Sequence, residues 1–166
     1  YDYFVDELIE ELKNKETIWE PVQTSTHNGF QGVKNIFENV EGNICDLKSI
    51  ILKEIDNYYI KFKNSDCLYI KNWPKHKFIK GWHLILKKQG YQEAHIHETG
   101  WLSGVIYLKT VPHLENDEGA IEFSLNGEHY FNRDVPVTVF HPKKGDIVFF
   151  PSSLNHRTIP FTTNTD

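Results

Sequence analysis

Two histidines stand one residue apart in a stretch that otherwise has the composition of a β-strand. Alternate residues of a strand point to the same face, so the imidazoles of His95 and His97 share one face. Imidazole is the commonest protein ligand for iron, zinc and copper. A third histidine, His156, follows after a long interval. We expect the three side chains to form a metal site, because strands far apart in sequence lie side by side in a jelly-roll barrel.

The chain has nine histidines, and most need no functional interpretation. Two histidines have two alternative interpretations. We expect His27, in a polar turn, and His83, in a predicted strand, each to be either a pocket residue or a structural histidine. The remaining four lie in predicted loops or strand ends, and we expect them on the surface: His76, His113, His129 and His141.

The composition is that of a globular domain, with 166 residues of which 39% are hydrophobic and 14% aromatic. The formal net charge is -5 and no lysine or arginine cluster stands out, so we expect no nucleic-acid partner. Apolar runs are too short for a membrane span and no signal peptide is visible. Cys45 and Cys67 are expected to be free, buried thiols in the reducing cytoplasm, with a disulfide as the alternative.

Two helices are predicted in the first third of the chain. Apolar residues from Phe4 onward have helical spacing, which predicts a helix that ends near Lys15. A second helix begins near Asp46, a suitable N-cap. Residues 18–32 between them are interpreted as irregular.

From residue 68 onward the pattern changes to short strands separated by glycine, proline, asparagine and aspartate. This order predicts a mainly β protein with N-terminal helices, either a β-sandwich or a jelly roll, in one domain over residues 1–166. The predicted strands are 68–72, 78–88, 92–97, 102–109, 119–125, 136–140, 146–150 and 156–161.

An ordered series of motifs covers most of the chain. It comprises Trp19-Glu20-Pro21, Asn28-Gly29-Phe30-Gln31-Gly32, Gly81-Trp82-His83, the run from His95 to Gly104, Gly119-Ala120-Ile121-Glu122-Phe123, the run from Pro142 to Ser152, and His156 with Pro160-Phe161. The series resembles the 2-oxoglutarate/Fe(II) oxygenase family that is often attached to tetratricopeptide repeats. The order of the motifs is more specific than any one of them.

The resemblance implies a double-stranded β-helix (a cupin-like jelly roll) over residues 66–166, buttressed by the helices of residues 1–65. It also implies an oxidoreductase in which His95, His97 and His156 hold ferrous iron. The cosubstrate would be 2-oxoglutarate and the oxidant O2, so that succinate and CO2 are released as a substrate is hydroxylated. The family does not fix that substrate, which is a small molecule or a protein.

His97 stands where the wider superfamily has a carboxylate, although the closer family commonly has His-x-His. Three neutral ligands neutralise less of the charge on Fe(II). Glu98 is the alternative ligand, but it points to the opposite face of an ideal strand and would reach the metal only through a bulge. We therefore prefer a site of His95, His97 and His156.

The resemblance further implies contacts with the cosubstrate. Tyr107, on the strand after the histidine pair, is the hydrogen-bond candidate, with core packing as the alternative reading. Thr158 shares a face with His156. Ser103 and Lys109 share the strand parity of Tyr107 and are weaker candidates.

These oxygenases usually bind the distal carboxylate of 2-oxoglutarate through a basic residue on the last strand. Arg157 is too early for this role, and strand alternation turns it away from the face of His156. The chain starts at Tyr1, contains no methionine and stops at Asp166, where the basic residue is due. We therefore expect a truncated final strand and a longer parent chain that continues with an arginine.

Two other functions compete with the oxygenase. The first is a cupin-like metalloenzyme that binds iron, zinc or another metal through three histidines without 2-oxoglutarate. The second is a non-catalytic jelly-roll module that binds a peptide or a carbohydrate. Metal analysis with a cosubstrate titration separates the metalloenzyme from the oxygenase. The binding module predicts that alanine at His95 or His156 leaves ligand binding unchanged.

Overall fold

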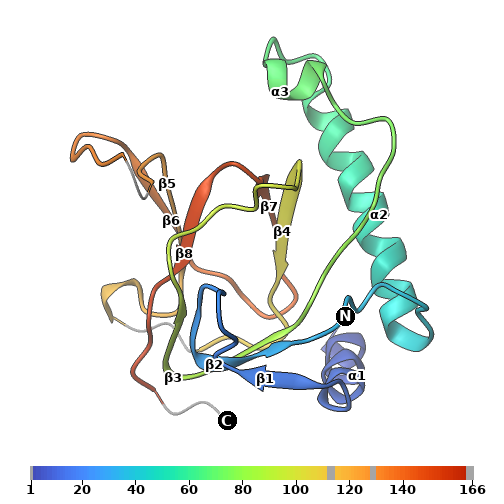
Figure 1. Cartoon of the computed structure of the whole chain (residues 1–166). Coiled ribbons are helices and arrows are strands. Elements are labelled where there is room, and N and C mark those ends of the chain that lie inside the picture. Colours follow the sequence, from blue (N-terminus) through green and yellow to red (C-terminus); the bar gives the residue numbers. More distant parts are fainter. Residues whose placement is uncertain (1, 112–114, 128–129, 164–166) are drawn as a thin grey trace.

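Two amphipathic helices pack together at one side of the molecule (Figure 1). In the computed structural model, which describes residues 2–111, 115–127 and 130–163, α1 spans Asp2–Lys13 and α2 spans Gly42–Phe62. Leu8 of α1 and Ile44 of α2 belong to one buried cluster, as their helical spacing predicts. The helix α2 begins four residues before the expected cap Asp46, at Gly42.

The segment expected to be irregular instead contains two strands. β1 (Thr17–Trp19) pairs with β2 (Thr26–Gly32), and β2 pairs with β3 (Leu84–Gln92), so that all three form an antiparallel sheet. The Asn28-Gly29 signal marks a shift in register inside β2, where Asn28 has a φ of 47°. The prediction was wrong because pairing with the distant β3 turns this local signal into a bulge.

The remaining strands form two antiparallel sheets. A two-stranded sheet pairs β4 (Leu102–Ile106) with β7 (Ile147–Pro151). A three-stranded sheet has the order β6 (Val137–Phe140), β5 (Ile121–Ser124) and β8 (Asn155–Thr158). The mainly β class with helices is confirmed. The described strands do not close into a barrel, so the jelly roll stays a prediction.

The sheet of β4 and β7 is the middle layer of the fold. On its outer face, Phe149 packs against the helical cluster and meets the ring of Tyr58 on α2 at 6.3 Å. On its inner face, Phe150 lies 5.0 Å from Phe123 of β5 and 4.5 Å from His156 of β8, measured between ring centroids. The inner face therefore points toward the histidine that the sequence singles out.

The connection between α2 and β3 differs from the prediction. The expected strand 68–72 is a short helix, α3 (Leu68–Lys71), and the ring of its Tyr69 lies 5.8 Å from that of Trp73, just beyond the helix end, measured between centroids. The expected strand 78–88 begins only at Leu84. Aromatic packing along one side of α3 thus overrides a β-rich composition.

Both cysteines are free, as expected, but they are exposed rather than buried. Cys45 lies outside the buried stripe of α2, and Cys67 caps the start of α3. No helix among the described residues has the length and apolarity needed to cross a membrane. The division of the chain at residue 65 stays a prediction, and β1 and β2 pair with β3 across it.

Candidate metal centre

His156 reaches the interior of the molecule from the strand β8. It pairs with Phe123 of β5, and only 5% of its surface is exposed. Residues directly opposite each other in an antiparallel pair share a face, so His156 points to the same side as Phe123. Phe150 covers it from the sheet β4–β7, at 4.5 Å between centroids. The imidazole is therefore held among aromatic rings that exclude water.

His95 and His97 lie in the segment between β3 and β4 and not in a regular strand, which corrects the predicted strand 92–97. His95 makes one isolated antiparallel bridge with His156, through backbone hydrogen bonds of 3.0 and 3.1 Å. The amide of His97 donates to the carbonyl of Ser152 at 2.9 Å. These bonds fasten the segment to β8 and to the turn that precedes it.

The three imidazoles converge on one point. Each of His95, His97 and His156 offers one ring nitrogen, and these atoms all lie within 4.8 Å of one another. The ring centroids are 4.3 to 5.1 Å apart. The group of side chains that the sequence predicts is thus brought together, and its nitrogens could hold one metal ion.

Backbone carbonyls orient two of the rings. Nδ1 of His95 lies 2.6 Å from the carbonyl of Glu93, and Nδ1 of His156 lies 3.1 Å from the carbonyl of Leu154. A carbonyl only accepts, so in each bond Nδ1 carries the proton and donates it. The tautomer leaves the lone pair on Nε2, which is the usual arrangement of a metal-binding histidine.

Burial favours the uncharged form of His97 and His156. Desolvation, with the nearby His95 as a smaller cause, lowers the pKa of His97. Desolvation lowers the pKa of His156 to about 4, against the raising effect of its hydrogen bond to Leu154. Neutral imidazole is the form that binds a metal, so His97 and His156 are ready to bind one at neutral pH.

No carboxylate among the described residues joins the three nitrogens. Glu98, the alternative ligand, is exposed. The group therefore consists of three neutral donors.

A pair of hydroxyls, one of them buried, supports the His97 side of the group. The Oγ atoms of Ser103 and Ser152 lie 2.7 Å apart, and Ser152 is 1% exposed. A Cβ atom added at Gly100 would lie 2.5 Å from Oγ of Ser152, so only glycine fits there. No functional role was predicted for Ser152, although Ser152 ends the motif run from Pro142 to Ser152.

The cosubstrate candidates are distributed along two strands. Ser103 lies near the His97 end of β4, whereas Tyr107 directly follows the other end of that strand. Desolvation, with the nearby Asp146 as a second cause, raises the pKa of Tyr107, so its phenol keeps its proton. Thr158 lies on the same face of β8 as His156, opposite Ile121.

Arg157 turns away from the site, as its strand parity predicts. Its Nε and Nη2 donate to the two carboxylate oxygens of Glu122 at 2.7 and 2.9 Å. The hydrogen bonds from Arg157 raise the pKa of its guanidinium. The guanidinium of Arg157 is thus engaged in a cross-strand ion pair with Glu122.

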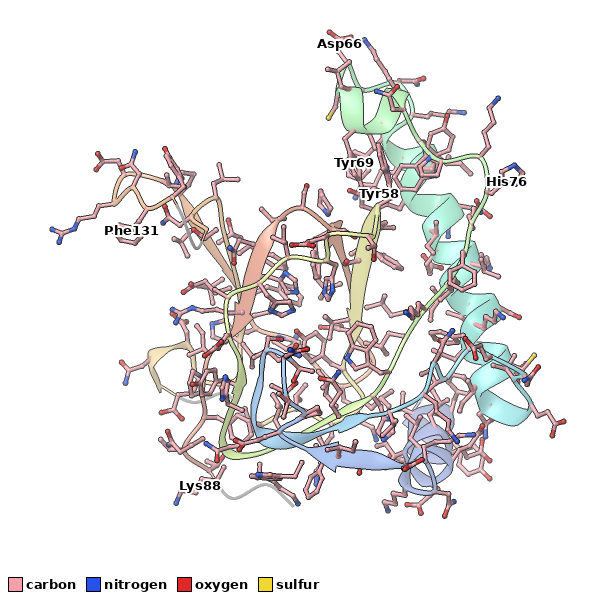
Figure 2. The ribbon with its side chains drawn as sticks, in the orientation of Figure 1. Tyr58, Asp66, Tyr69, His76, Lys88 and Phe131 are labelled. Atoms are coloured by element: carbon pink, nitrogen blue, oxygen red, sulfur yellow. The ribbon has the colours of Figure 1, made fainter. Side chains whose placement is uncertain are left out.

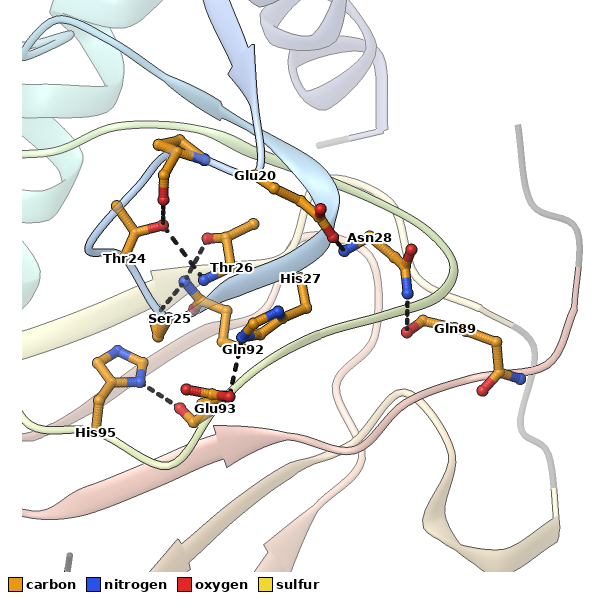
Figure 3. A network of polar contacts seen from close by, with 11 residues as sticks. Glu20, Thr24, Ser25, Thr26, His27, Asn28, Gln89, Gln92, Glu93 and His95 are labelled. Carbon is orange, nitrogen blue, oxygen red and sulfur yellow. Dashed lines mark hydrogen bonds and ion pairs between the residues drawn. The ribbon is translucent and has the colours of Figure 1, made fainter.

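A polar network lies behind His95 (Figure 3). Nε2 of His27 lies 3.0 Å from a carboxylate oxygen of Glu93, and its ring stacks on Tyr91. The amide of Glu93 donates to the carbonyl of Ser25 at 2.8 Å. His27 thus lies next to the residue whose carbonyl orients His95, which agrees better with the structural interpretation than with a pocket residue.

The other histidines are not part of the group. His83 is half-buried, and neither of its ring nitrogens has a hydrogen-bond partner among the described residues. His76 and His141 are exposed, as predicted. His113 and His129 lie outside the described residues.

Fold and site together define a mostly β protein with antiparallel sheets and a three-histidine group that could hold a metal ion. Residues 80–166 match the model of a family described as "Putative 2OG-Fe(II) oxygenase". The match covers more than half of the chain, so the protein belongs to this family, which confirms the resemblance seen in the sequence. No curated protein matches the chain.

Proposed function

We propose that the protein is an Fe(II)- and 2-oxoglutarate-dependent oxygenase that hydroxylates a C–H bond of its substrate and releases succinate and CO2. The observation that carries the proposal is the convergence of three imidazole nitrogens within 4.8 Å, in a chain of the 2OG-Fe(II) oxygenase family. We also propose that the three antiparallel sheets belong to a double-stranded β-helix.

The donor set fits ferrous iron. Imidazole suits iron, and three protein ligands leave coordination positions for other groups. Three neutral imidazoles leave both positive charges of Fe(II) unbalanced, and the carboxylate next to the keto group of 2-oxoglutarate would balance one of them. Bound iron would supply the activation of O2 and the oxidative decarboxylation of the cosubstrate.

The protein's own residues position and shield these reactants. His95 and His156 would hold the metal through Nε2 and His97 through one of its ring nitrogens, and Phe150 and Phe123 keep water from the buried side of His156. Exclusion of water strengthens the electrostatic attraction between metal and carboxylate.

We assign the contacts with 2-oxoglutarate to the side chains that the sequence names. Tyr107 offers a protonated phenol, and Thr158 offers a hydroxyl on the strand face of His156. Ser103 is the weakest of the three, because its hydroxyl already bonds to Ser152.

Turnover of 2-oxoglutarate tests the proposal. Purified protein with Fe(II), ascorbate and O2 should convert 2-oxoglutarate to succinate slowly even without substrate, and His156→Ala should abolish this conversion. The matched control is His141→Ala, which removes an exposed imidazole and should leave the rate unchanged. Equal succinate formation by the His156→Ala protein would contradict the assignment.

The absence of a carboxylate from the group favours a second function, a three-histidine metalloenzyme that does not use 2-oxoglutarate. In that case the protein would bind one metal ion per chain, and 2-oxoglutarate would not change the visible spectrum of the anaerobic Fe(II) complex. A weak charge-transfer band on addition of 2-oxoglutarate supports the oxygenase instead.

A further inference from the structure

The connection between α2 and β3 concentrates positive charge. Residues 61–80, which include the last turn of α2, contain six lysines and one aspartate, so they carry +5 in a chain whose net charge is -5. This corrects the expectation that no lysine cluster stands out, because the lysines are spread over twenty residues of one segment. The rest of the chain therefore carries -10. The connection stands out from the body as an arm (Figure 2), with Asp66 near its tip and His76 on the segment that returns toward β3.

The returning segment, residues 75–80, keeps most of its charge free. Lys77 forms an ion pair with Asp56 of α2. Lys75 and Lys80 are exposed and have no ion pair with any residue that the structure describes. Their positive charges are available to an anionic partner.

The backbone of the returning segment is also unpaired. Residues 75–80 make no backbone hydrogen bond with another described residue. Pairing resumes at Gly81, whose amide donates to Oδ1 of Asn35 at 2.9 Å and whose carbonyl accepts from Ile36 at 2.9 Å. Residues 75–80 belong to no helix or strand, and their N–H and C=O groups are free to pair with a peptide that binds by strand addition.

Apolar side chains lead from this segment to the metal centre. Phe78 is 83% exposed and Trp82 is 39% exposed. The ring of Trp82 lies 6.0 Å from that of His97. A second contact links the arm to the segment between His97 and β4. In it, Oη of Tyr69 donates a hydrogen bond to the carbonyl of Trp101 at 2.9 Å.

We propose that residues 75–80 dock an extended acidic segment of a protein substrate, which passes Trp82 to present its target side chain to the metal centre. That the docked protein is a substrate rests on the proposed oxygenase function, whereas the docking itself does not. The peptide's carboxylates would face Lys75 and Lys80, and its backbone would pair with the unpaired backbone of the segment.

A peptide fits these features better than a nucleic acid. The sugar-phosphate backbone has no N–H groups to pair with the carbonyls of residues 75–80. A nucleic acid longer than the segment would also extend over a surface that carries net negative charge and would be repelled.

Fluorescence anisotropy tests the docking. The probe is a fluorescein-labelled peptide of alternating glutamate and phenylalanine, and a second probe has glutamine in place of glutamate. Lys75→Glu/Lys80→Glu should weaken binding of the acidic probe about tenfold or more, with a smaller effect at high salt. The matched control, Lys53→Glu/Lys88→Glu, makes the same charge change at exposed lysines outside the segment and should leave binding unchanged.

Three results would overturn the proposal: equal binding of the glutamine probe, equal loss in both double variants, or tighter binding of a single-stranded oligonucleotide. The His156→Ala protein should bind the acidic probe normally, because docking does not require the metal. Normal binding without succinate formation by the unmodified protein would therefore refute the oxygenase and leave the docking site standing. Circular dichroism of each variant verifies that it is folded.

Discussion

His95 and His156 are aligned by bonds that exist without a metal. Each donates a proton from Nδ1 to a nearby carbonyl, and each is tied to the other by a backbone bridge. A ligand that is already oriented loses little conformational entropy when the metal binds. The two rings are therefore already oriented for metal binding in the metal-free protein.

The buried imidazole of His156 should make the metal-free protein sensitive to acid. Its pKa is lowered from 6.5 to about 4 in the folded state, so the unfolded chain binds the proton more readily between these values. The free energy of unfolding should fall as the pH drops from about 6.5 to about 4, by up to about 3 kcal/mol. Urea unfolding with a chelator at several pH values measures this fall.

The variant His156→Leu provides the control for the acid sensitivity. It removes the titrating group from a buried position. Its free energy of unfolding should change less over the same pH window, and an unchanged slope would contradict the role assigned to this imidazole.

Gly100 should not tolerate a side chain. In Gly100→Ala the new Cβ would meet Oγ of the buried Ser152 at 2.5 Å, so the turn that carries His97 must shift. We expect a loss of about 1–3 kcal/mol in the free energy of unfolding and weaker metal binding. In the control Gly127→Ala, the nearest atom is Nδ2 of Asn155 at 3.6 Å, which is ordinary contact. Equal effects in both variants would refute the steric argument.

The sequence was sufficient to predict which histidines meet, but not how they meet. The face shared by His95 and His97 was argued from strand alternation, whereas only His95 forms a bridge. Ser152 was not predicted, because its importance arises from contacts with residues distant in the chain. The type and spacing of the side chains are enough to predict the metal ligands. Contacts between residues distant in the chain determine which other residues hold those ligands in place.

Among the elements, the sheet β4–β7 couples the helices to the site. Phe149 faces the helical cluster, and its neighbour Phe150 faces His156. This follows from alternation along β7, which places successive side chains on opposite faces. The helices thus support the sheet without contributing to the metal group.

Leu8→Ala should test this division between support and site. Leu8 is 1% exposed, and the cavity left by the substitution should lower the free energy of unfolding by about 2–5 kcal/mol. Tyr3→Ala on the same helix removes a side chain that is 77% exposed and should change stability by less than about 0.5 kcal/mol. Metal affinity measured on the folded protein should be unchanged in both, and its loss in Leu8→Ala would contradict the division.

Elements with strong periodicity could be predicted, and those that depend on distant partners could not. The two long helices follow from their apolar stripes. The strand β2 could not be predicted, because its pairing partner β3 is far along the chain. The helix α3 could not be predicted either, because its β-forming residues pack through Tyr69 on Trp73 and Trp101.

In the molecule as a whole, the three histidines bring together segments that are far apart in the chain. They are the one group of possible metal ligands found among the described residues. His95 and His97 precede β4, and His156 lies on β8. A metal that binds all three stabilises only the folded chain, because the unfolded chain does not hold them together.

Metal should therefore raise the stability of the protein. At a free metal concentration of about 100 times Kd, the free energy of unfolding should rise by about 2.7 kcal/mol, and a chelator should reverse the change. Thermal unfolding with and without Fe(II) under anaerobic conditions measures it. The His156→Ala protein should show no comparable rise, and an equal rise would place the metal elsewhere.

The most direct test of the central claim is a crystal structure of the protein with Fe(II) and 2-oxoglutarate, prepared without oxygen, with anomalous data at the iron edge. The account predicts one iron bound by Nε2 of His95 and His156 and by a ring nitrogen of His97, and chelated by 2-oxoglutarate. Iron bound at another place, or through Glu98 instead of His97, would contradict it.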